Sequence, residues 1–244
     1  EDLLNEQEKK EIHKIIEYYK KIGYEIYMNT EIEKIKKIFK NKVSVFTGQT
    51  GAGKSTLMKI LYGLESQSAG EILFDGKTSK EIKDDKKFGA LIESPAIYMN
   101  LSAFNNLKTK ALLYDIPDET IRETLNLIGL ANTGRKKAGK FSLGMKQRLG
   151  LGMAIITNPE FLILDEPTNG LDPDGIKELL DLINSLKQKG MTILISSHQL
   201  HEVSKIADDI VILHQGKIHY NQPNQDKQDL EKLFFSIVHG GYEK

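Results

Sequence analysis

Nine consecutive residues, GQTGAGKST at positions 48–56, constrain this chain more than any other feature. They match the pattern G-x-x-x-x-G-K-[ST] and follow a β-branched and aromatic run at 43–47, which predicts a buried strand. A predicted helix begins at Ser55. Glycines let successive backbone N–H groups face phosphate oxygens, and the helix N-terminus adds partial positive charge. We therefore predict a phosphate-binding loop of Gly48, Gln49, Thr50, Gly51, Ala52, Gly53, Lys54, Ser55 and Thr56.

Within this loop, two side chains have specific roles. Lys54 is expected to reach the β- and γ-phosphates of a nucleotide, and the Ser55 hydroxyl is expected to ligate Mg²⁺. A glycine-rich turn with a chance lysine is the alternative, and the flanking strand and helix argue against it.

Two carboxylates follow a second apolar run. Residues 161–166 read FLILDE, so Asp165 and Glu166 emerge at the end of a predicted buried strand, where ligands bind in open α/β sheets. Strands that end in solvated acids are common, but the phosphate loop upstream favours a functional pair. We expect Asp165 to hold Mg²⁺ and Glu166 to act as the general base that polarises an attacking water.

The order of elements predicts the fold class. The helix–strand–helix–strand order of residues 3–47 is an α/β pattern that favours parallel pairing, and further strand candidates lie at 71–74, 88–92, 161–164, 191–196 and 210–213. Residues 100 to about 140 are mostly helical, with breaks at prolines and glycines. We predict an α/β fold with a mainly parallel sheet flanked by helices, and an inserted helical subdomain at about 95–157.

Residues 141–156, FSLGMKQRLGLGMAII, resemble the signature of the ABC ATPases, a family of P-loop NTPases. The usual form is LSGGQ followed by a helix. This chain departs at the first, third and fifth positions and keeps Ser142 and Gly144. The resemblance implies that these two residues address the γ-phosphate bound to the opposite subunit of a dimer. DEPTNGLDPD at 165–174 is similar to the family's acidic strand end continuing into the D-loop, with Asp172 at the latter.

Two more segments extend the resemblance. Ser196-Ser197-His198 resembles the family's switch segment, which implies that His198 contacts the γ-phosphate and the attacking water. A lone histidine after a strand is usually structural, but the order and spacing of the motifs favour a phosphate role. Glu93 falls where the family usually has a glutamine. A carboxylate there can still approach Mg²⁺ or water, although its charge and pKa differ from those of an amide.

The resemblance covers about residues 48–244, and IESPAIYMNLSAFNNL with SLGMKQRLGLGMAI is most similar to subunits of bacitracin-resistance and lantibiotic-immunity exporters. It implies a Mg²⁺-dependent ATP hydrolase that works with a second ATPase subunit, as a homo- or heterodimer. A separate transmembrane permease, docked near residues 93–110, would form the path for peptide antibiotics. The subunit would lie in the cytoplasm, peripheral on the inner face of the membrane.

Composition agrees with these expectations. The 34 basic and 34 acidic residues cancel, so bulk charge predicts no nucleic-acid partner. There is no cysteine, which excludes a disulfide framework and fits a reducing cytoplasm. No run of about 18 apolar residues occurs, so if the protein moves something across a membrane, another chain must form the path.

The first 47 residues fit the family less well. They predict helices and a short strand in an atypical α/β segment, and they resemble the segment before the phosphate loop of circularly permuted, ribosome-associated GTPases. A fusion that crosses over within the loop would remove or rebuild the antiparallel subdomain around 71–76, together with its adenine-stacking aromatic residue. Tyr24 and Tyr27 are candidates for base stacking, although core packing is the commoner role of such residues.

Three other functions remain open on the sequence. A GTPase, or a fused P-loop NTPase with impaired base recognition, is the main alternative, but Asn41-Lys42 is followed by Val43-Ser44 and not by the N-K-x-D pattern that reads guanine. ABC ATPases that act on nucleic acid or ribosomes usually carry two ATPase domains, and this chain has one set of motifs. A non-catalytic nucleotide-binding module conflicts with intact Lys54, Asp165, Glu166 and His198.

Overall fold

The computed structural model describes residues 42–48, 51–68, 72–74, 77–78, 87–214, 216–224 and 230–238, all within the compact unit formed by residues 40–244. The predictions for residues 1–41, including those for Tyr24 and Tyr27, lie outside the described residues, as do those for Gln49 and Thr50. The strands are β1 (Val43–Gly48), β2 (Leu73–Phe74), β3 (Lys77–Thr78), β4 (Phe88–Leu91), β5 (Phe161–Asp165), β6 (Thr192–Ser196), β7 (Asp209–His214) and β8 (Lys217–Pro223).

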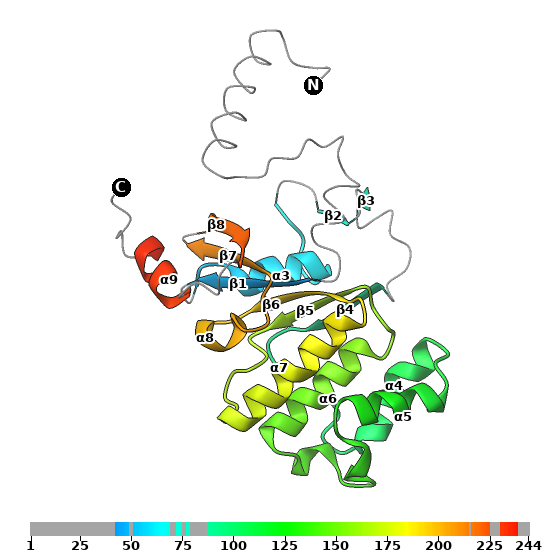
Figure 1. Cartoon of the computed structure of the whole chain (residues 1–244). Coiled ribbons are helices and arrows are strands. Elements are labelled where there is room, and N and C mark those ends of the chain that lie inside the picture. Colours follow the sequence, from blue (N-terminus) through cyan, green and yellow to red (C-terminus); the bar gives the residue numbers. More distant parts are fainter. Residues whose placement is uncertain are drawn as a thin grey trace. The chain divides into compact units, whose positions relative to one another are not determined.

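The main sheet has the strand order β4-β5-β6-β1-β7-β8. The first five strands are parallel, and β8 pairs antiparallel with β7 at the edge. The expected parallel pairing is therefore confirmed. Helices cover both faces of the sheet (Figure 1), which explains why β5 and β6 read as nearly continuous apolar runs and not as alternating patterns.

The helices that form these layers include the one predicted from Ser55, which begins one residue earlier, at Lys54. They are α3 (Lys54–Tyr62), α4 (Ala103–Leu113), α5 (Asp118–Leu127), α6 (Leu143–Ile155), α7 (Pro173–Gln188), α8 (Leu200–Val203) and α9 (Leu230–Val238), with 3₁₀ turns at η3 (Ala131–Thr133) and η4 (Ala138–Lys140). Within the described part of the chain, none of them is long and apolar enough to cross a membrane.

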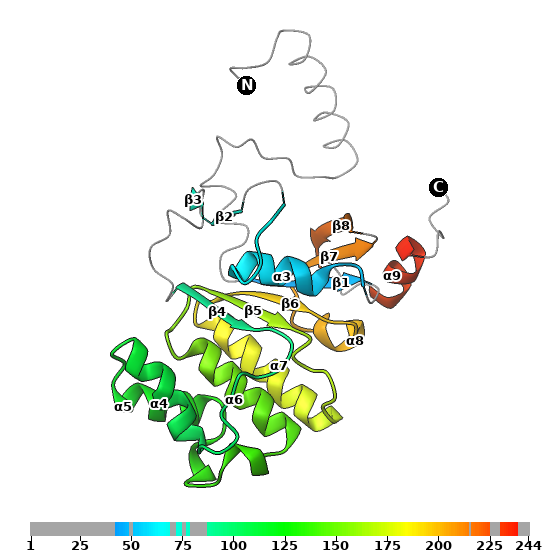
Figure 2. The ribbon, with the colours of Figure 1, turned by 180° about the vertical axis from the view of Figure 1, so that it is seen from behind.

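Successive side chains of β5 and β6 point to opposite faces of the sheet, so they divide the core into two layers. Met58 of α3 packs with Ile163 and Leu194 on one face of the sheet. Their neighbours Leu162 and Ile193 face the larger cluster, which includes α6 and α7. Figures 1 and 2 show α3 on one side of the strands and α6 and α7 on the other. The phosphate loop therefore leads from the sheet into a helix whose inner face is anchored in the core.

Residues between β4 and β5 form the helices α4, α5 and α6. Figure 1 shows α4 and α5 beside α6, on the side away from α3. The chain breaks were predicted from single residues: α5 begins after Pro117, and Gly129 and Gly134 both have positive φ, at 67° and 53°. These helices build the part of the molecule that carries Ser142.

The predicted strand at 71–74 is present as β2. It pairs antiparallel with β3 in a two-stranded sheet that is separate from the main one. The segment that would pair with it in an ordinary ABC domain precedes residue 42 and lies outside the described residues. A rebuilt antiparallel subdomain therefore stays a prediction.

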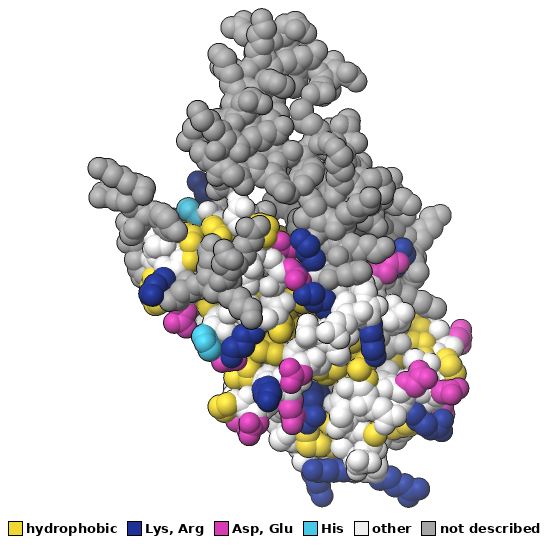
Figure 3. Space-filling model, in the orientation of Figure 1, with side chains coloured by type: hydrophobic (Ala, Val, Ile, Leu, Met, Phe, Trp, Pro, Cys, Tyr) yellow, Lys and Arg dark blue, Asp and Glu magenta, His cyan; other side chains and the backbone are white. Residues whose placement is uncertain are grey.

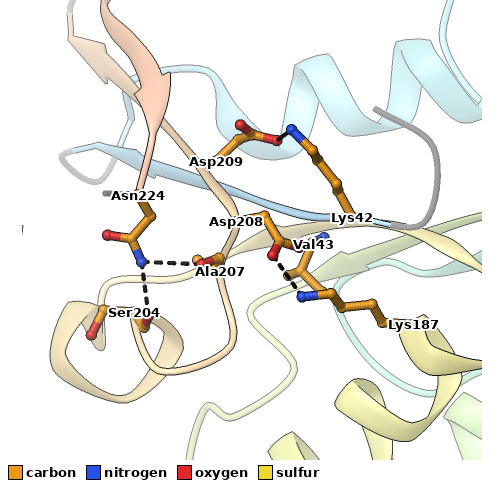
Figure 4. Close-up of polar contacts among 8 residues, drawn as sticks. All are labelled: Lys42, Val43, Lys187, Ser204, Ala207, Asp208, Asp209 and Asn224. Atoms are coloured by element: carbon orange, nitrogen blue, oxygen red, sulfur yellow. Dashed lines mark hydrogen bonds and ion pairs between the residues drawn. The ribbon is translucent and has the colours of Figure 1, made fainter. Parts of the chain in front are cut away.

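Charged side chains hold the amino ends of β1 and β7 together (Figure 4). Asp208 accepts a hydrogen bond from the Val43 backbone N–H at 2.7 Å and another from Lys187 Nζ at 2.6 Å. The buried Asp209 carboxylate lies 3.5 Å from Lys42 Nζ. These contacts join β1, β7 and the end of α7, and so fix the strands whose opposite ends carry the site.

Candidate functional site

The phosphate loop begins where β1 touches β7. A Cβ atom at Gly48 would lie 2.2 Å from the backbone oxygen of Leu213, so this position has no room for a side chain. Gly51 and Gly53 have φ of 83° and 94°, a region that glycine adopts without strain. Sterics and backbone conformation thus explain three glycines of the motif independently of any phosphate contact.

Lys54, the first residue of α3, is buried, and its Nζ donates a hydrogen bond to the Gly48 oxygen at 2.6 Å. Burial lowers the pKa of this ammonium, while the nearby carboxylates of Glu166 and Asp165 act in the opposite direction. The loop lysine and both acidic residues therefore lie close enough to influence one another electrostatically. Ser55 is half-buried at the same helix start, and Thr56 is exposed.

Asp165 is held by a neighbour on the next strand. β5 and β6 are paired so that Asp165 lies opposite Ser196, and the Ser196 hydroxyl donates to the Asp165 carboxylate at 2.5 Å. The same hydroxyl accepts from the Glu166 backbone N–H at 2.9 Å. Asp165 is only 3% exposed, so a fixed donor offsets part of the cost of burying its charge.

Sequence reasoning placed Ser196 in the switch segment but gave it no role. Nothing in the sequence of β6 indicates which residue faces Asp165, because that depends on the register between two parallel strands.

Glu166 adopts a strained backbone conformation. Its φ is 48°, in the left-handed region that a glutamate rarely occupies, and such strain is concentrated at functional sites. Its Oε1 lies 2.7 Å from the Nδ1 atom of His198, which follows β6. Burial raises the pKa of Glu166, and the charges of His198 and Lys54 oppose that rise. A carboxylate with a raised pKa, held beside an imidazole, suits proton abstraction from water.

The turn after β6 fixes His198. The Ser197 backbone N–H donates to the Phe46 oxygen of β1 at 3.1 Å, and the Ser197 hydroxyl accepts from the Gln199 N–H at 3.0 Å. The His198 side chain is 54% exposed, so it can reach a ligand at the edge of the sheet. The structure thus brings together Lys54, Asp165, Glu166 and His198, as predicted.

Glu93 pairs with a lysine of α3 and not with the other predicted site residues. It has φ of 63°, and its carboxylate lies 2.6 Å from Lys59 Nζ on α3. The hydrogen bond from Lys59 to Glu93 raises the pKa of Lys59. The Glu93 side chain is 63% exposed, and its metal-binding role stays a prediction.

Ser142, Gly144 and Asp172 form a second group. The Ser142 hydroxyl accepts from the Met145 N–H at 3.3 Å and caps α6, and Asp172 accepts from the Gly175 N–H at 3.1 Å and caps α7. The two caps are adjacent in space, because a Cβ at Gly144 would lie 3.8 Å from Leu171. Their role toward a partner subunit's nucleotide stays a prediction.

Charged side chains of both signs lie on one face of the described part of the chain (Figure 3). On the face shown in Figure 3, acidic and basic side chains lie beside one another, and hydrophobic side chains are scattered between them.

Comparison with known proteins gives one consistent family. The sequence pattern of the ABC transporter family matches residues 36–169. The lantibiotic transport ATP-binding protein SrtF of Streptococcus pyogenes is 48% identical over 195 residues, which span 80% of this chain and 85% of that protein. The bacitracin transport ATP-binding protein BcrA of Bacillus licheniformis is 46% identical over 179 residues, spanning 71% of this chain and 58% of that protein.

Solved structures agree with the sequence matches. The structure of an ATP-binding subunit of an ABC transporter has a TM-score of 0.67 and 30% identity, and covers 80% of this chain and 84% of its own. CbiO1 of Clostridium perfringens, part of the ABC transporter complex CbiONQ, has a TM-score of 0.70 at 26% identity, over 80% of this chain and 83% of its own.

Proposed function

Because this chain belongs to the ABC transporter family, as an ATP-binding subunit that hydrolyses ATP, we propose that it powers the export of peptide antibiotics through a separate permease. The matched relatives are named for lantibiotic and bacitracin transport, which supports this substrate class. The family assignment also favours ATP hydrolysis over the GTPase alternative.

The observation that carries the chemistry is the 2.7 Å contact between His198 and Glu166 beside the buried Asp165 and Lys54. Glu166 takes the proton of the attacking water, and His198 orients that water and stabilises the charge that develops on the γ-phosphate. When a nucleotide binds, the Lys54 Nζ leaves the Gly48 oxygen, donates to a phosphate oxygen and neutralises phosphate charge. Ser196 keeps Asp165 and the Glu166 backbone in place.

The residues present fit Mg²⁺. This ion prefers a few hard oxygen ligands from the protein and completes its shell with waters and phosphate oxygens. The Ser55 hydroxyl and the Asp165 carboxylate supply such oxygens, with Glu93 as a further candidate. When bound, the ion would neutralise phosphate charge. The Ser196 hydroxyl leaves the second Asp165 oxygen for it.

Two further parts of the proposal concern partners. Ser142, Gly144 and Asp172 complete the site of a second ATPase subunit across a two-fold axis, as a pair of helix caps at one surface would permit. The permease docks near residues 93–110 on the cytoplasmic side of the membrane. Tyr98 and Met99 support this location, because they are 55% and 49% exposed, and large apolar side chains of these types anchor interfaces.

The proposal is tested by ATP and GTP hydrolysis of the wild-type chain and of Glu166→Gln. We expect ATP hydrolysis to fall by about 10²–10⁴-fold, with ATP binding retained and ATP-dependent dimers detected by light scattering. Glu160→Gln is the control, because Glu160 precedes β5 at the opposite end of the same strand. Unchanged hydrolysis in Glu166→Gln would refute the assignment of the base.

The substrate class is tested in a susceptible strain that carries the permease. Wild type, but not Glu166→Gln, should raise the lantibiotic or bacitracin concentration needed to stop growth. Equal sensitivity of both strains to both antibiotic classes would refute the proposed substrate.

A further inference from the structure

Asn106 is a buried polar residue that the catalytic site does not use. It lies in the first turns of α4 and is 0% exposed, which for an asparagine requires that its amide be satisfied within the protein. Its side chain forms hydrogen bonds with one short segment, residues 98–102. The Asn106 Oδ1 accepts from the Tyr98 N–H at 2.6 Å, and its Nδ2 donates to the oxygens of Tyr98 at 3.0 Å and Ser102 at 2.9 Å.

This pattern defines the orientation of the amide and the shape of the segment. One N–H and several carbonyl groups surround it, so the amide oxygen faces the N–H and the amide nitrogen faces the carbonyls. The Leu101 oxygen lies 3.5 Å from the same nitrogen. The side chain adds to backbone bonds, since the Tyr98 oxygen also accepts from the Leu101 N–H at 3.1 Å and the Ser102 oxygen from the Asn106 N–H at 2.9 Å. For the Tyr98 N–H, the Asn106 amide oxygen is the acceptor.

The segment is clamped from its other side as well. The Gly139 N–H donates to the Met99 oxygen at 2.8 Å, and the Ala138 N–H donates to the Leu101 oxygen at 2.8 Å. A Cβ at Gly139 would lie 3.1 Å from the Met99 oxygen, so the approach is close. Residues 138–139 precede the Ser142 cap of α6 by only a few positions.

With its backbone held on both sides, the segment presents Tyr98 and Met99 to solvent although both are large and apolar. We propose that Asn106 is a positioning residue for coupling: it holds Tyr98 and Met99 in the conformation that binds the permease, and connects that surface through residues 138–139 to Ser142. This inference rests on the permease-docking surface proposed above and names the residue on which its shape depends.

The test uses membranes from the cells that produce this chain, after deletion of its gene and removal of peripheral proteins. Saturable rebinding of the purified chain to these membranes is measured for wild type, Asn106→Asp and Asn105→Asp. Aspartate at 106 keeps the acceptor for Tyr98 but puts a carboxylate oxygen against three carbonyls. Asn105, one position earlier in α4, is exposed and serves as the matched control.

We expect Asn106→Asp to weaken rebinding by about tenfold or more, as loss of an interface anchor does, while ATP hydrolysis by the purified chain changes by less than about twofold. Asn105→Asp should behave as wild type. Gly139→Ala is a second variant outside the core. It pushes on the Met99 carbonyl, and it should also weaken rebinding without loss of hydrolysis.

Two outcomes would overturn the inference. One is wild-type rebinding by Asn106→Asp and Gly139→Ala while Tyr98→Ala fails to rebind, which would leave the docking surface intact and remove the role of Asn106. The other is a parallel loss of hydrolysis, thermal stability and rebinding in Asn106→Asp with normal rebinding of Gly139→Ala, which would make Asn106 merely structural. Normal rebinding of Tyr98→Ala and Met99→Ala would instead refute the docking surface itself.

Discussion

The Nδ1 atom of His198 lies 2.7 Å from Oε1 of Glu166, and the two residues follow neighbouring parallel strands of one sheet. Glu166 reaches this position through a left-handed backbone conformation, with φ of 48°. The backbone strain and the burial of the carboxyl group both reduce the stability of the fold, and the chemistry of the site requires both. Stability and function should therefore oppose each other at Glu166.

Glu166→Gln should stabilise the ligand-free protein near neutral pH. Burial raises the pKa of Glu166 above its ordinary value of 4.5, and the charge of Asp165 raises it further. The charges of His198 and Lys54 lower this pKa, but they do not cancel the rise. The neutral acid is thus favoured by folding, and its stabilising effect is complete below pH 4.5 and is lost as the pH rises through the raised pKa. Glutamine stays neutral, so the variant should have the higher melting temperature at pH 7, with the difference shrinking toward pH 4.

Thermal unfolding across this pH range is the measurement, with Glu160→Gln as the control, since that side chain is 67% exposed. A melting-temperature difference that is the same at acidic and neutral pH would contradict the burial argument.

Ser196→Ala should destabilise the protein by about 1–3 kcal/mol and reduce ATP hydrolysis, because the buried Asp165 loses its donor and the Glu166 N–H loses an acceptor. Urea unfolding and steady-state ATPase assays measure the two effects. Ser185→Ala is the matched control, since that hydroxyl donates only to the Leu182 oxygen within α7. Full activity in Ser196→Ala would show that Asp165 needs no support from β6.

Gly48→Ala should abolish ATP binding and cost about 1–3 kcal/mol of stability, because the added Cβ would lie 2.2 Å from the Leu213 oxygen and must push two strands apart. Binding of a fluorescent ATP analogue and chemical unfolding are the measurements. Gly134→Ala has only the strain of a positive φ of 53° in open space, so it should bind ATP normally. Equal behaviour of the two variants would exclude the steric explanation.

Asp208→Ala should cost more than Lys187→Met, because the first removes the acceptor of both Val43 N–H and Lys187 and the second removes one donor (Figure 4). A double-mutant cycle on the free energy of unfolding should give a coupling of about 0.5–3 kcal/mol between the two side chains. Additive effects, with no coupling, would show that the pair does not stabilise the fold.

The sequence by itself determined the phosphate loop, the acidic strand end and the order of strands and helices. These features are local: GQTGAGKST sets its own turn, the short apolar run in FLILD favours a buried strand, and Asp172-Pro173 starts a helix by capping it. Ser142 and Asp172 cap the helices that follow them for the same reason, since a cap depends on residues three positions away.

Only the tertiary structure decided which side chains meet. The register of β5 against β6 puts Ser196 on Asp165, and the turn after β6 brings His198 to Glu166. Asn106 reaches back to Tyr98 only because the chain folds over the start of α4. Such pairings depend on the packing of distant strands and helices, and no periodicity or spacing along the chain encodes them.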